Sequence, residues 1–296
     1  MQDSGMNPLE MHTQKDNLPM VLPQGMDAIC LDRSLRGGGR HGVFLIKSPQ
    51  KQWVVKIYHH KRNRVQRFLS GLENYLTGRS PLNPRTRFCT ENKTLNIWQE
   101  NGFDVFRRSK ELPPVSIDFP HVVFEHVSGR TLKEYFLDPQ IAKADKLHTL
   151  KRFLPEWGRR HALALDTCNH YLIQERATFQ HVFMSSEDDR LISFDFEVVY
   201  TTRHSLPGII AREIAGYIRS LFSAVPQQDF NDYLDVLIRG YPHRDFLCHP
   251  YKYFFQHPNR LLRFLFSMDR QLPRNRRPKS KYNIALRIED YMQKKP

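Results

Sequence analysis

The spacing of apolar residues is mainly that of strands before residue 127 and mainly that of helices after it, and this change limits the possible folds more than any other feature. Before it, apolar residues occur in short runs rich in β-branched and aromatic side chains, which are typical of strands in an antiparallel sheet. The runs are Ala28–Leu31, Val43–Ile46, Trp53–Tyr58 and Val122–Glu125. Between the third and fourth runs, apolar residues at helical spacing predict one helix from Arg85 to Glu100, beside the sheet.

After residue 127 the spacing becomes that of helices. Apolar residues recur every three or four positions from Leu147 to His161, although Pro155 is expected to kink or divide this segment. Two short apolar runs interrupt the helical half, Val182–Met184 and Leu191–Phe194, and we expect them to pair as a hairpin. The other predicted segments of this half are helices around Ile209–Phe222 and Phe230–Ile238 and a basic tail at Arg260–Lys295.

These patterns predict an α+β fold with two lobes. A chain of 296 residues with 40% hydrophobic side chains can bury a substantial core. We expect residues 1–25 to be a flexible tail, residues 26–127 to form a small antiparallel sheet lobe with one main helix, and residues 128–296 to form a mostly helical lobe.

Composition limits the partners and the compartment. Forty-five Lys and Arg against 31 Asp and Glu give a net charge of +14, which attracts polyanions such as nucleic acid, acidic lipid or phosphorylated sugar. The cysteines form no C-x-x-C pair, which argues against a disulfide framework or a thiolate zinc site and fits a reducing compartment. No apolar run approaches the roughly 20 residues that span a bilayer, so we expect a soluble or peripheral protein.

A glycine cluster and a lysine come first among the residues that could carry chemistry. The segment Arg36–Gly42 lies between two predicted strands, where backbone N–H groups of glycines could approach a phosphate closely. The alternative is a plain hairpin turn. Lys56 follows in mid-strand and could reach back under such a loop, or it could be an outward lysine on an alternating strand.

Two carboxylates have similar competing interpretations. Glu91 is the best candidate to fix Lys56 in place, with Glu100 as the second choice and a solvated helix glutamate as the alternative. Asp195 ends an apolar run between Phe194 and Phe196, where a carboxylate needs a cation or a metal. A strand-end cap or a salt bridge is the alternative for Asp195.

The order and spacing of these motifs resemble the lipopolysaccharide core kinase family, which includes the heptose and 3-deoxy-manno-octulosonic acid kinases and related toluene-tolerance-type proteins. The resemblance covers roughly residues 28 to 220. Its motifs are the glycine segment, Val55–Ile57, the Glu91 helix ending at Asn101–Phe103, the run Phe124–Leu132, the segment Tyr171–Met184 and Asp195–Glu197. No single motif is specific, and their order carries the resemblance.

The resemblance implies a bilobal protein-kinase-like fold that uses ATP and Mg²⁺. By it, Glu91 would orient Lys56, Asp195 would hold Mg²⁺, and Glu213 would support the catalytic loop from a helix. The adenine would stack against a hinge at residues 124 to 129. The implied nucleotide-binding residues are Gly37, Gly38, Gly39, Gly42, Lys56, Glu125 and Val127.

The sequence departs from the family in the catalytic loop, where the family has an Asp and, five positions later, an Asn or His that binds a second metal. If His181 fills the metal position, Arg176 stands at the Asp position. If Glu175 replaces the Asp, the metal position holds Gln180, a neutral and weaker ligand for a hard cation. Both registers stay open at this stage.

Three functions remain as hypotheses. The first is an ATP- and Mg²⁺-dependent kinase that phosphorylates a sugar of a lipopolysaccharide core precursor or another acidic glycolipid precursor. The second is a pseudokinase that acts as a regulatory or assembly module in envelope biogenesis. The third, a nucleic-acid-binding protein, is disfavoured because aromatic residues are not interleaved with the basic runs. The family implies a cytoplasmic location, with peripheral contact to the anionic inner-membrane surface.

Overall fold

The computed structural model describes residues 20–31, 41–59, 74, 78–201 and 205–294. Gly37, Gly38 and Gly39 lie outside the described residues. The chain divides into two compact units, one formed by residues 1–62 and 107–126 and the other by residues 63–106 and 127–296. The predicted change near residue 127 therefore coincides with a boundary between units.

The first unit contains a four-stranded antiparallel sheet, and each strand corresponds to a predicted run. The strands are β1 (Asp27–Cys30), β2 (His41–Lys47), β3 (Gln52–Tyr58) and β4 (His121–Glu125), in that spatial order. Phe44 and Ile46 of β2 and Val55 and Ile57 of β3 are buried in one hydrophobic cluster on this sheet. Since alternate side chains of a strand share a face, each pair covers the same face of the sheet.

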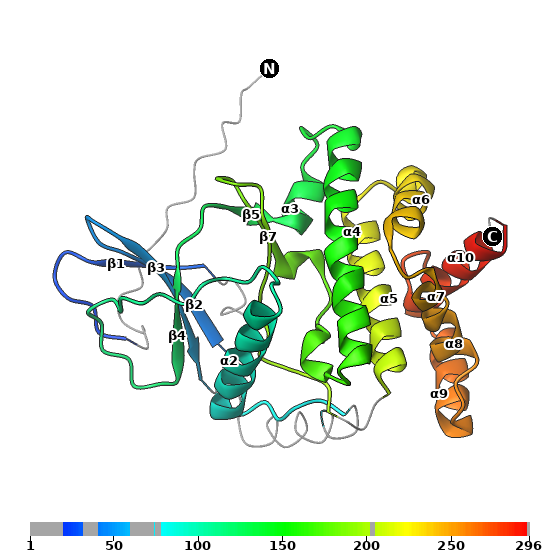
Figure 1. Ribbon diagram of the computed structural model, residues 1–296, viewed down its shortest axis with the longest axis horizontal. Helices are drawn as coiled ribbons and strands as arrows, with labels where there is room; N and C mark the ends of the chain where they lie inside the picture. Colours follow the sequence, from blue (N-terminus) through cyan, green and yellow to red (C-terminus); the bar gives the residue numbers. More distant parts are fainter. Residues whose placement is uncertain (1–19, 32–40, 60–73, 75–77, 202–204, 295–296) are drawn as a thin grey trace. The chain divides into compact units, whose positions relative to one another are not determined.

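The second unit is mostly helical (Figure 1). Its α-helices are α2 (Pro84–Glu100), α3 (Leu132–Leu137), α4 (Lys143–Asp166), α5 (Leu206–Ala224), α6 (Phe230–Gly240), α7 (Arg244–Leu247), α8 (His249–Phe255), α9 (Arg260–Gln271) and α10 (Lys281–Lys294). Its 3₁₀ helices are η3 (His170–Leu172), η4 (Phe179–His181), η5 (Gln227–Asp229) and η6 (Pro273–Asn275). Sheet and helices together make the chain an α+β protein, as predicted.

Helix α2 forms where the sequence predicts it, but it belongs to the helical unit. Asn83 caps its first turn by accepting a 2.8 Å hydrogen bond from Thr86 N–H, and Gly102, at φ +69°, follows its end. The expectation that this helix shares a lobe with the sheet needs correction. Trp98 shows why, because its indole N–H donates to Tyr171 O at 2.9 Å and its ring packs on Phe196, both in the second unit.

A second sheet of three strands lies in the helical unit and contains the predicted hairpin. Strands β6 (Val182–Ser185) and β7 (Leu191–Ser193) pair antiparallel, and β5 (Gly129–Thr131) adds a third strand that the sequence does not predict. Gly129 has φ +152°, and a Cβ atom there would lie 2.1 Å from Met184 O. Only glycine therefore allows β5 to approach β6 this closely.

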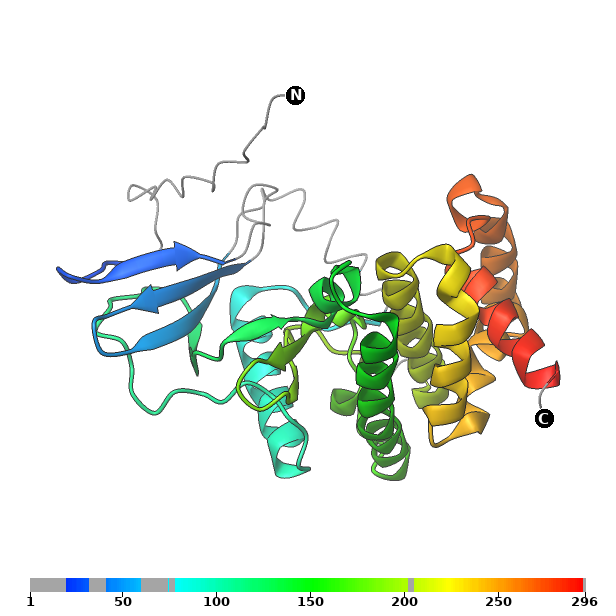
Figure 2. The same cartoon turned by 90° about the horizontal axis from the view of Figure 1, so that it is seen from above.

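Helices α4 and α5 lie side by side in both views (Figures 1 and 2). Of the kink or division expected at Pro155, the division does not occur, because helix α4 is continuous through this residue. Pro155 is exposed, whereas Phe153, Leu154 and Trp157 around it are buried. Burial of these side chains holds the helix on both sides of the missing backbone donor.

The segment Arg260–Lys295, predicted as a basic tail, instead contains two helices, α9 and α10. Helix α10 buries Ile284, Ala285 and Ile288, which explains why this charged segment folds. None of the described helices combines the length and the apolar character needed to cross a membrane.

Candidate metal centre

Three carboxylates meet in the helical unit. They come from Glu91 of α2 and from Asp195 and Glu197, which follow β7. One oxygen of each side chain lies within 4.8 Å of the others, and Glu91 and Glu197 are 2% and 1% exposed. Within the described part of the chain, this is the one such group of acidic, histidine and cysteine side chains, and we call it the acidic cluster.

Asp195 reaches the cluster through an unusual backbone conformation. Its φ of +67° lies in the left-handed region, which costs energy for a residue with a side chain. The chain just before it is fixed, because Ser193 N–H donates to Asp104 O at 2.9 Å and Phe194 N–H donates to His181 O at 3.1 Å. The β6–β7 hairpin thus delivers this carboxylate to a defined place.

Arg87 supplies a buried counter-charge. Its guanidinium, on α2, donates to Glu197 Oε2, with the Nε bond 3.0 Å long, and both side chains are almost wholly buried. A buried carboxylate needs such a partner to stay charged. This pair also ties α2 to the segment after β7, so the element that carries Glu91 is fixed to the one that carries Asp195.

His181 and Arg176 both lie close to the Asp195 carboxylate. His181 Nε2 is 3.4 Å from Asp195 Oδ2, and its Nδ1 is 3.0 Å from Arg176 O. Arg176 Nη1 is 4.0 Å from Asp195 Oδ2 and 3.8 Å from Glu197 Oε1. His181, rather than the exposed Gln180, therefore faces Asp195.

Glu175 is paired with two arginines. Its Oε1 is 2.6 Å from Arg79 Nε, its Oε2 is 3.7 Å from Arg176 Nε, and its side chain is 5% exposed. Burial lowers the pKa of Arg176. The attraction of three nearby carboxylates, Asp195, Glu197 and Glu175, is larger than this effect, so the net result is a raised pKa. Arg176 is therefore a permanent cation at the edge of the cluster.

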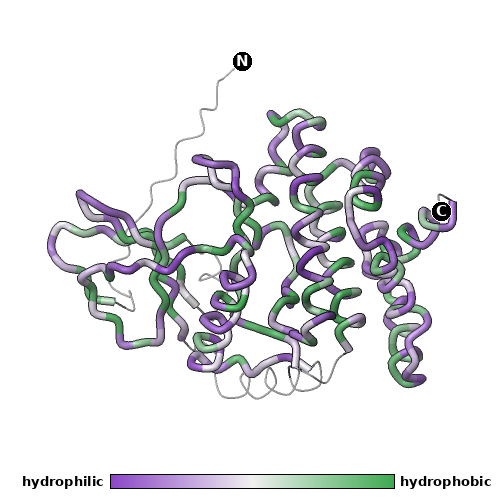
Figure 3. Tube along the Cα trace, in the orientation of Figure 1, coloured by the Kyte–Doolittle hydropathy of each residue, from purple (hydrophilic) through white to green (hydrophobic). Residues whose placement is uncertain are grey.

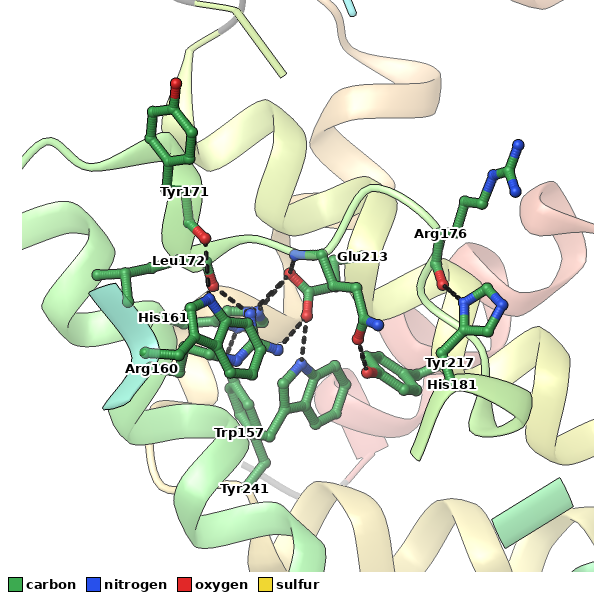
Figure 4. A network of polar contacts seen from close by, with 12 residues as sticks. Trp157, Arg160, His161, Tyr171, Leu172, Arg176, His181, Glu213, Tyr217 and Tyr241 are labelled. Atoms are coloured by element: carbon green, nitrogen blue, oxygen red, sulfur yellow. Dashed lines mark hydrogen bonds and ion pairs between the residues drawn. The ribbon is translucent and has the colours of Figure 1, made fainter. Parts of the chain in front are cut away.

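A buried network around Glu213 holds the segment before Glu175 (Figure 4). Glu213 forms a buried ion pair with Arg160, accepts from Gln174 N–H at 3.0 Å and has His161 Nε2 at 3.3 Å. Burial raises the pKa of Glu213, but Arg160 and His161 outweigh it and bring the pKa down to about 2. Gln174 Nε2 in turn donates to Phe194 O at 2.9 Å, so the network reaches the residue before Asp195.

One face of α5 carries this support. Glu213, Gly216 and Ser220 lie three and four residues apart and therefore share a face of the helix. Ser220 Oγ accepts from Phe179 N–H at 2.9 Å, and a Cβ atom on Gly216 would lie 2.8 Å from Ala177 O. Helix α5 thus touches the segment 174–179 at three levels, and Glu213 lies where the resemblance implies a supporting carboxylate.

The other residues singled out from the sequence lie elsewhere. Gln180 is exposed in η4, and Glu100 is exposed at the end of α2. The remaining nucleotide-binding candidates among the described residues are Gly42 on β2, Lys56 on β3 and Glu125 at the end of β4, in the first unit, and Val127 in the second. Lys56 is 5% exposed, so it is not a lysine on a solvent-facing side of its strand.

Three residues of the site were missed from the sequence alone: Glu197, Arg79 and Arg87. The sequence pattern could have predicted Glu197, because an acid two residues after Asp195 can bind the same cation. No local pattern predicts Arg87, since its partner is 110 residues away. Arg79 likewise meets Glu175 only after the chain folds.

The acidic cluster fits a divalent cation with oxygen ligands. Carboxylate oxygens are the donors that Mg²⁺ prefers, and three of them converge here from two elements. Asp195 is held on one side by His181, and Glu197 by Arg87, so the donors are oriented by a surrounding layer of polar contacts. The arrangement can hold a cation next to the arginine that would contact an anionic ligand.

No family model matches this chain, and a search of curated proteins finds no match either. Among solved structures, the chain is similar to the crystal structure of a double mutant of the Mycobacterium tuberculosis PknI kinase domain. The identity is 12%, the TM-score is 0.39, and the alignment covers 92% of this chain and 98% of that one. At this TM-score the likeness carries no argument, and the conclusions below depend on the geometry of the site.

Proposed function

We propose that this protein is a kinase-like phosphotransferase that binds ATP with Mg²⁺ and phosphorylates a sugar hydroxyl of a lipopolysaccharide core precursor or a similar acidic glycolipid. The acidic cluster of Glu91, Asp195 and Glu197 is the observation that carries this proposal. It occurs at the end of the hairpin where the resemblance implies a metal ligand. The cluster supports a divalent cation, whereas phosphoryl transfer, the sugar acceptor and the cytoplasmic location follow from the resemblance.

Each residue near the cluster has a defined task in this proposal. Asp195, Glu91 and Glu197 would hold Mg²⁺, which when bound neutralises charge that develops on the phosphate oxygens. Glu91 thus has another role here than the orientation of Lys56 that the resemblance implies. His181 keeps the Asp195 carboxylate in place. Arg176 keeps its charge because its pKa is raised, so it can pair with a phosphate oxygen.

No carboxylate replaces the family's catalytic Asp at position 176, because Glu175 beside it is bound to Arg79. Phosphoryl transfer depends mainly on positioning and charge stabilisation, so transfer without a strong base is slower but still feasible. We expect a slow kinase whose rate is limited by the missing base.

A pseudokinase that acts in regulation or assembly is the second candidate, and Arg176 favours it. The guanidinium of Arg176 lies within ion-pair distance of both Asp195 and Glu197, where it competes with a cation for the same oxygens. A protein that uses this arginine to close the site would keep the fold and bind no metal. Nucleic-acid binding has only the net charge of +14 in its favour.

Turnover of ATP in the presence of an acceptor tests the proposal. Purified protein should transfer phosphate to a lipopolysaccharide core precursor, and Lys56→Ala and Asp195→Ala should each stop the transfer. The matched controls are Lys47→Ala, on the neighbouring strand β2, and Asp189→Asn, in the exposed turn of the β6–β7 hairpin. Equal turnover in all five proteins would remove the kinase proposal.

Restoring the missing base separates the two candidates. If transfer is slow for lack of a base, Arg176→Asp should speed it by about tenfold or more, because a positioned base contributes on that scale or above. A protein that shows no transfer to any sugar acceptor, with or without this change, would be a pseudokinase.

A further inference from the structure

Helix α9 presents an apolar stripe that no described element covers. Its exposed large hydrophobic residues are Leu261, Phe264, Leu265 and Met268, and Leu272 continues the stripe just after the helix. Exposure is 65% for Leu261 and 60% for Phe264, so these side chains extend into solvent. At 3.6 residues per turn, the four positions within the helix fall within an arc of about 100°.

The opposite face of α9 packs against helix α8. Phe266 packs against Tyr253 and Phe254 of α8, and Arg270 lies over the ring of Phe255 at 4.4 Å. Helix α9 is thus anchored on α8, at the outer edge of the helical unit (Figures 1 and 2). Figure 3 shows hydrophilic and hydrophobic residues interspersed along it. The exposed stripe is therefore a second apolar face on an already docked helix.

The segment that contains this stripe is rich in positive charge. From residue 258 to residue 281 the sequence has eight Lys and Arg but only one acid, Asp269. That acid is neutralised locally, because Lys281 Nζ is 2.9 Å and Arg274 Nη2 3.6 Å from its carboxylate. The exposed cations are Arg260, Arg263, Arg274, Arg276, Arg277 and Lys279.

We propose that the apolar stripe of α9 and the exposed cations of its segment bind the surface of an anionic phospholipid bilayer, with Phe264 and its neighbours inserted at the level of the headgroups. An exposed apolar face on a helix rich in arginine is the pattern of helices that lie in the membrane interface. The inference does not depend on the proposed function, because lipid binding is measured without nucleotide or acceptor.

Charge and apolar character together favour an anionic bilayer over two other binding partners, a second copy of the chain and nucleic acid. A second copy of the chain would bring the same cations together across a symmetric interface, where they repel each other. Nucleic acid would match the cations but would leave the exposed leucines and Phe264 without an apolar partner. Anionic lipids offer both negative headgroups and an apolar layer just beneath them.

Vesicle flotation with the full chain tests the inference. Wild-type protein should float with vesicles of phosphatidylcholine and phosphatidylglycerol and only weakly with vesicles of phosphatidylcholine alone. Phe264→Ser should weaken binding to the anionic vesicles about tenfold, since binding scales with buried apolar area. Leu137→Ser is the matched control, because Leu137 of α3 is 52% exposed and lies outside the stripe.

Measuring vesicle binding at several salt concentrations distinguishes the contribution of the charges from that of the apolar stripe. Arg260→Gln combined with Arg263→Gln should weaken binding at low salt and flatten its salt dependence, whereas Phe264→Ser should leave that dependence unchanged. All substituted side chains are exposed, so melting temperatures should match that of the wild type. Equal binding by Phe264→Ser and wild type, equal binding to neutral and anionic vesicles, or a dimer that Phe264→Ser abolishes would each overturn the inference.

Discussion

A guanidinium group borders the acidic cluster, because Arg176 Nη1 lies 4.0 Å from Asp195 and 3.8 Å from Glu197. Each positive charge so close to carboxylates opposes a divalent cation on the same oxygens. Arg176 is about half exposed, and solvent screens part of this effect. The side chain can also turn toward water, so it weakens the cation site without removing it.

Replacing this arginine should therefore strengthen metal binding. We expect Arg176→Gln to raise the affinity for Mn²⁺, used in place of Mg²⁺, by roughly tenfold, because one nearby positive charge is removed. Electron paramagnetic resonance of free Mn²⁺ measures the affinity. Arg152→Gln, at an exposed arginine of α4, should leave it unchanged. An Arg176→Gln affinity equal to that of the wild type would mean that the cation binds elsewhere.

Glu213 gives a pH dependence with a definite sign. Its pKa falls from 4.5 in the unfolded chain to about 2 in the folded one, so its contribution is complete above pH 4.5 and is lost as the pH falls toward 2. The linked free energy is about 3 kcal/mol. Glu213→Gln should remove this dependence and, at neutral pH, destabilise the fold by about 3 kcal/mol or more, because Arg160 then stays buried without its partner.

Chemical denaturation between pH 2 and 7 measures both effects. Glu187→Gln, at an exposed glutamate of the β6–β7 turn, is the control. If the free energy of unfolding falls with pH as steeply in Glu213→Gln as in the control, the low pKa of Glu213 is not a source of stability.

Among the elements, helix α5 connects the helical core to the site. It contacts the segment 174–179 through Glu213, Gly216 and Ser220. Gly216 permits the close approach of Ala177. Alanine is favoured over glycine in a helix by about 1 kcal/mol, but a methyl group here would lie 2.8 Å from Ala177 O, so the segment must move.

We expect Gly216→Ala to weaken Mn²⁺ binding several-fold without raising the melting temperature, since displacing Ala177 also displaces Arg176 and His181. Arg219→Ala, on the exposed side of α5, should leave the affinity unchanged. A Gly216→Ala protein that is more stable than the wild type and binds Mn²⁺ equally well would show that the site does not depend on this contact.

Elements with strong local patterns were predictable, and those that depend on distant partners were not. The strands β1 to β4, helix α2 and the β6–β7 hairpin follow from runs of β-branched or periodic apolar residues. Strand β5 has three residues and forms only because β6 pairs with it. Pro155 does not divide helix α4, because burial of Trp157 and its neighbours outweighs the local penalty of one proline.

At the scale of the whole molecule, the sequence predicted two units and an α+β fold but assigned α2 to the sheet lobe. Adjacency along the chain suggested that assignment, whereas Arg87 and Trp98 join α2 to the helical unit through contacts that a single sequence does not reveal. Asp195 was predicted as a metal ligand and Glu91 as a partner of Lys56, while Glu197 and Arg87, which complete the surroundings of the acidic cluster, were missed. Whether Gln180 or His181 faces Asp195 likewise required coordinates.

Calorimetric titration of Mg²⁺ into the protein with a non-hydrolysable ATP analogue tests the central claim most directly, that the acidic cluster holds the cation that accompanies the nucleotide. Wild-type protein and Asp189→Asn should bind Mg²⁺ with equal affinity, and Asp195→Asn should bind it at least about 100-fold more weakly, because a ligand is lost rather than a supporting group. Equal affinity in Asp195→Asn and wild type, or no binding by the wild type, would contradict the account.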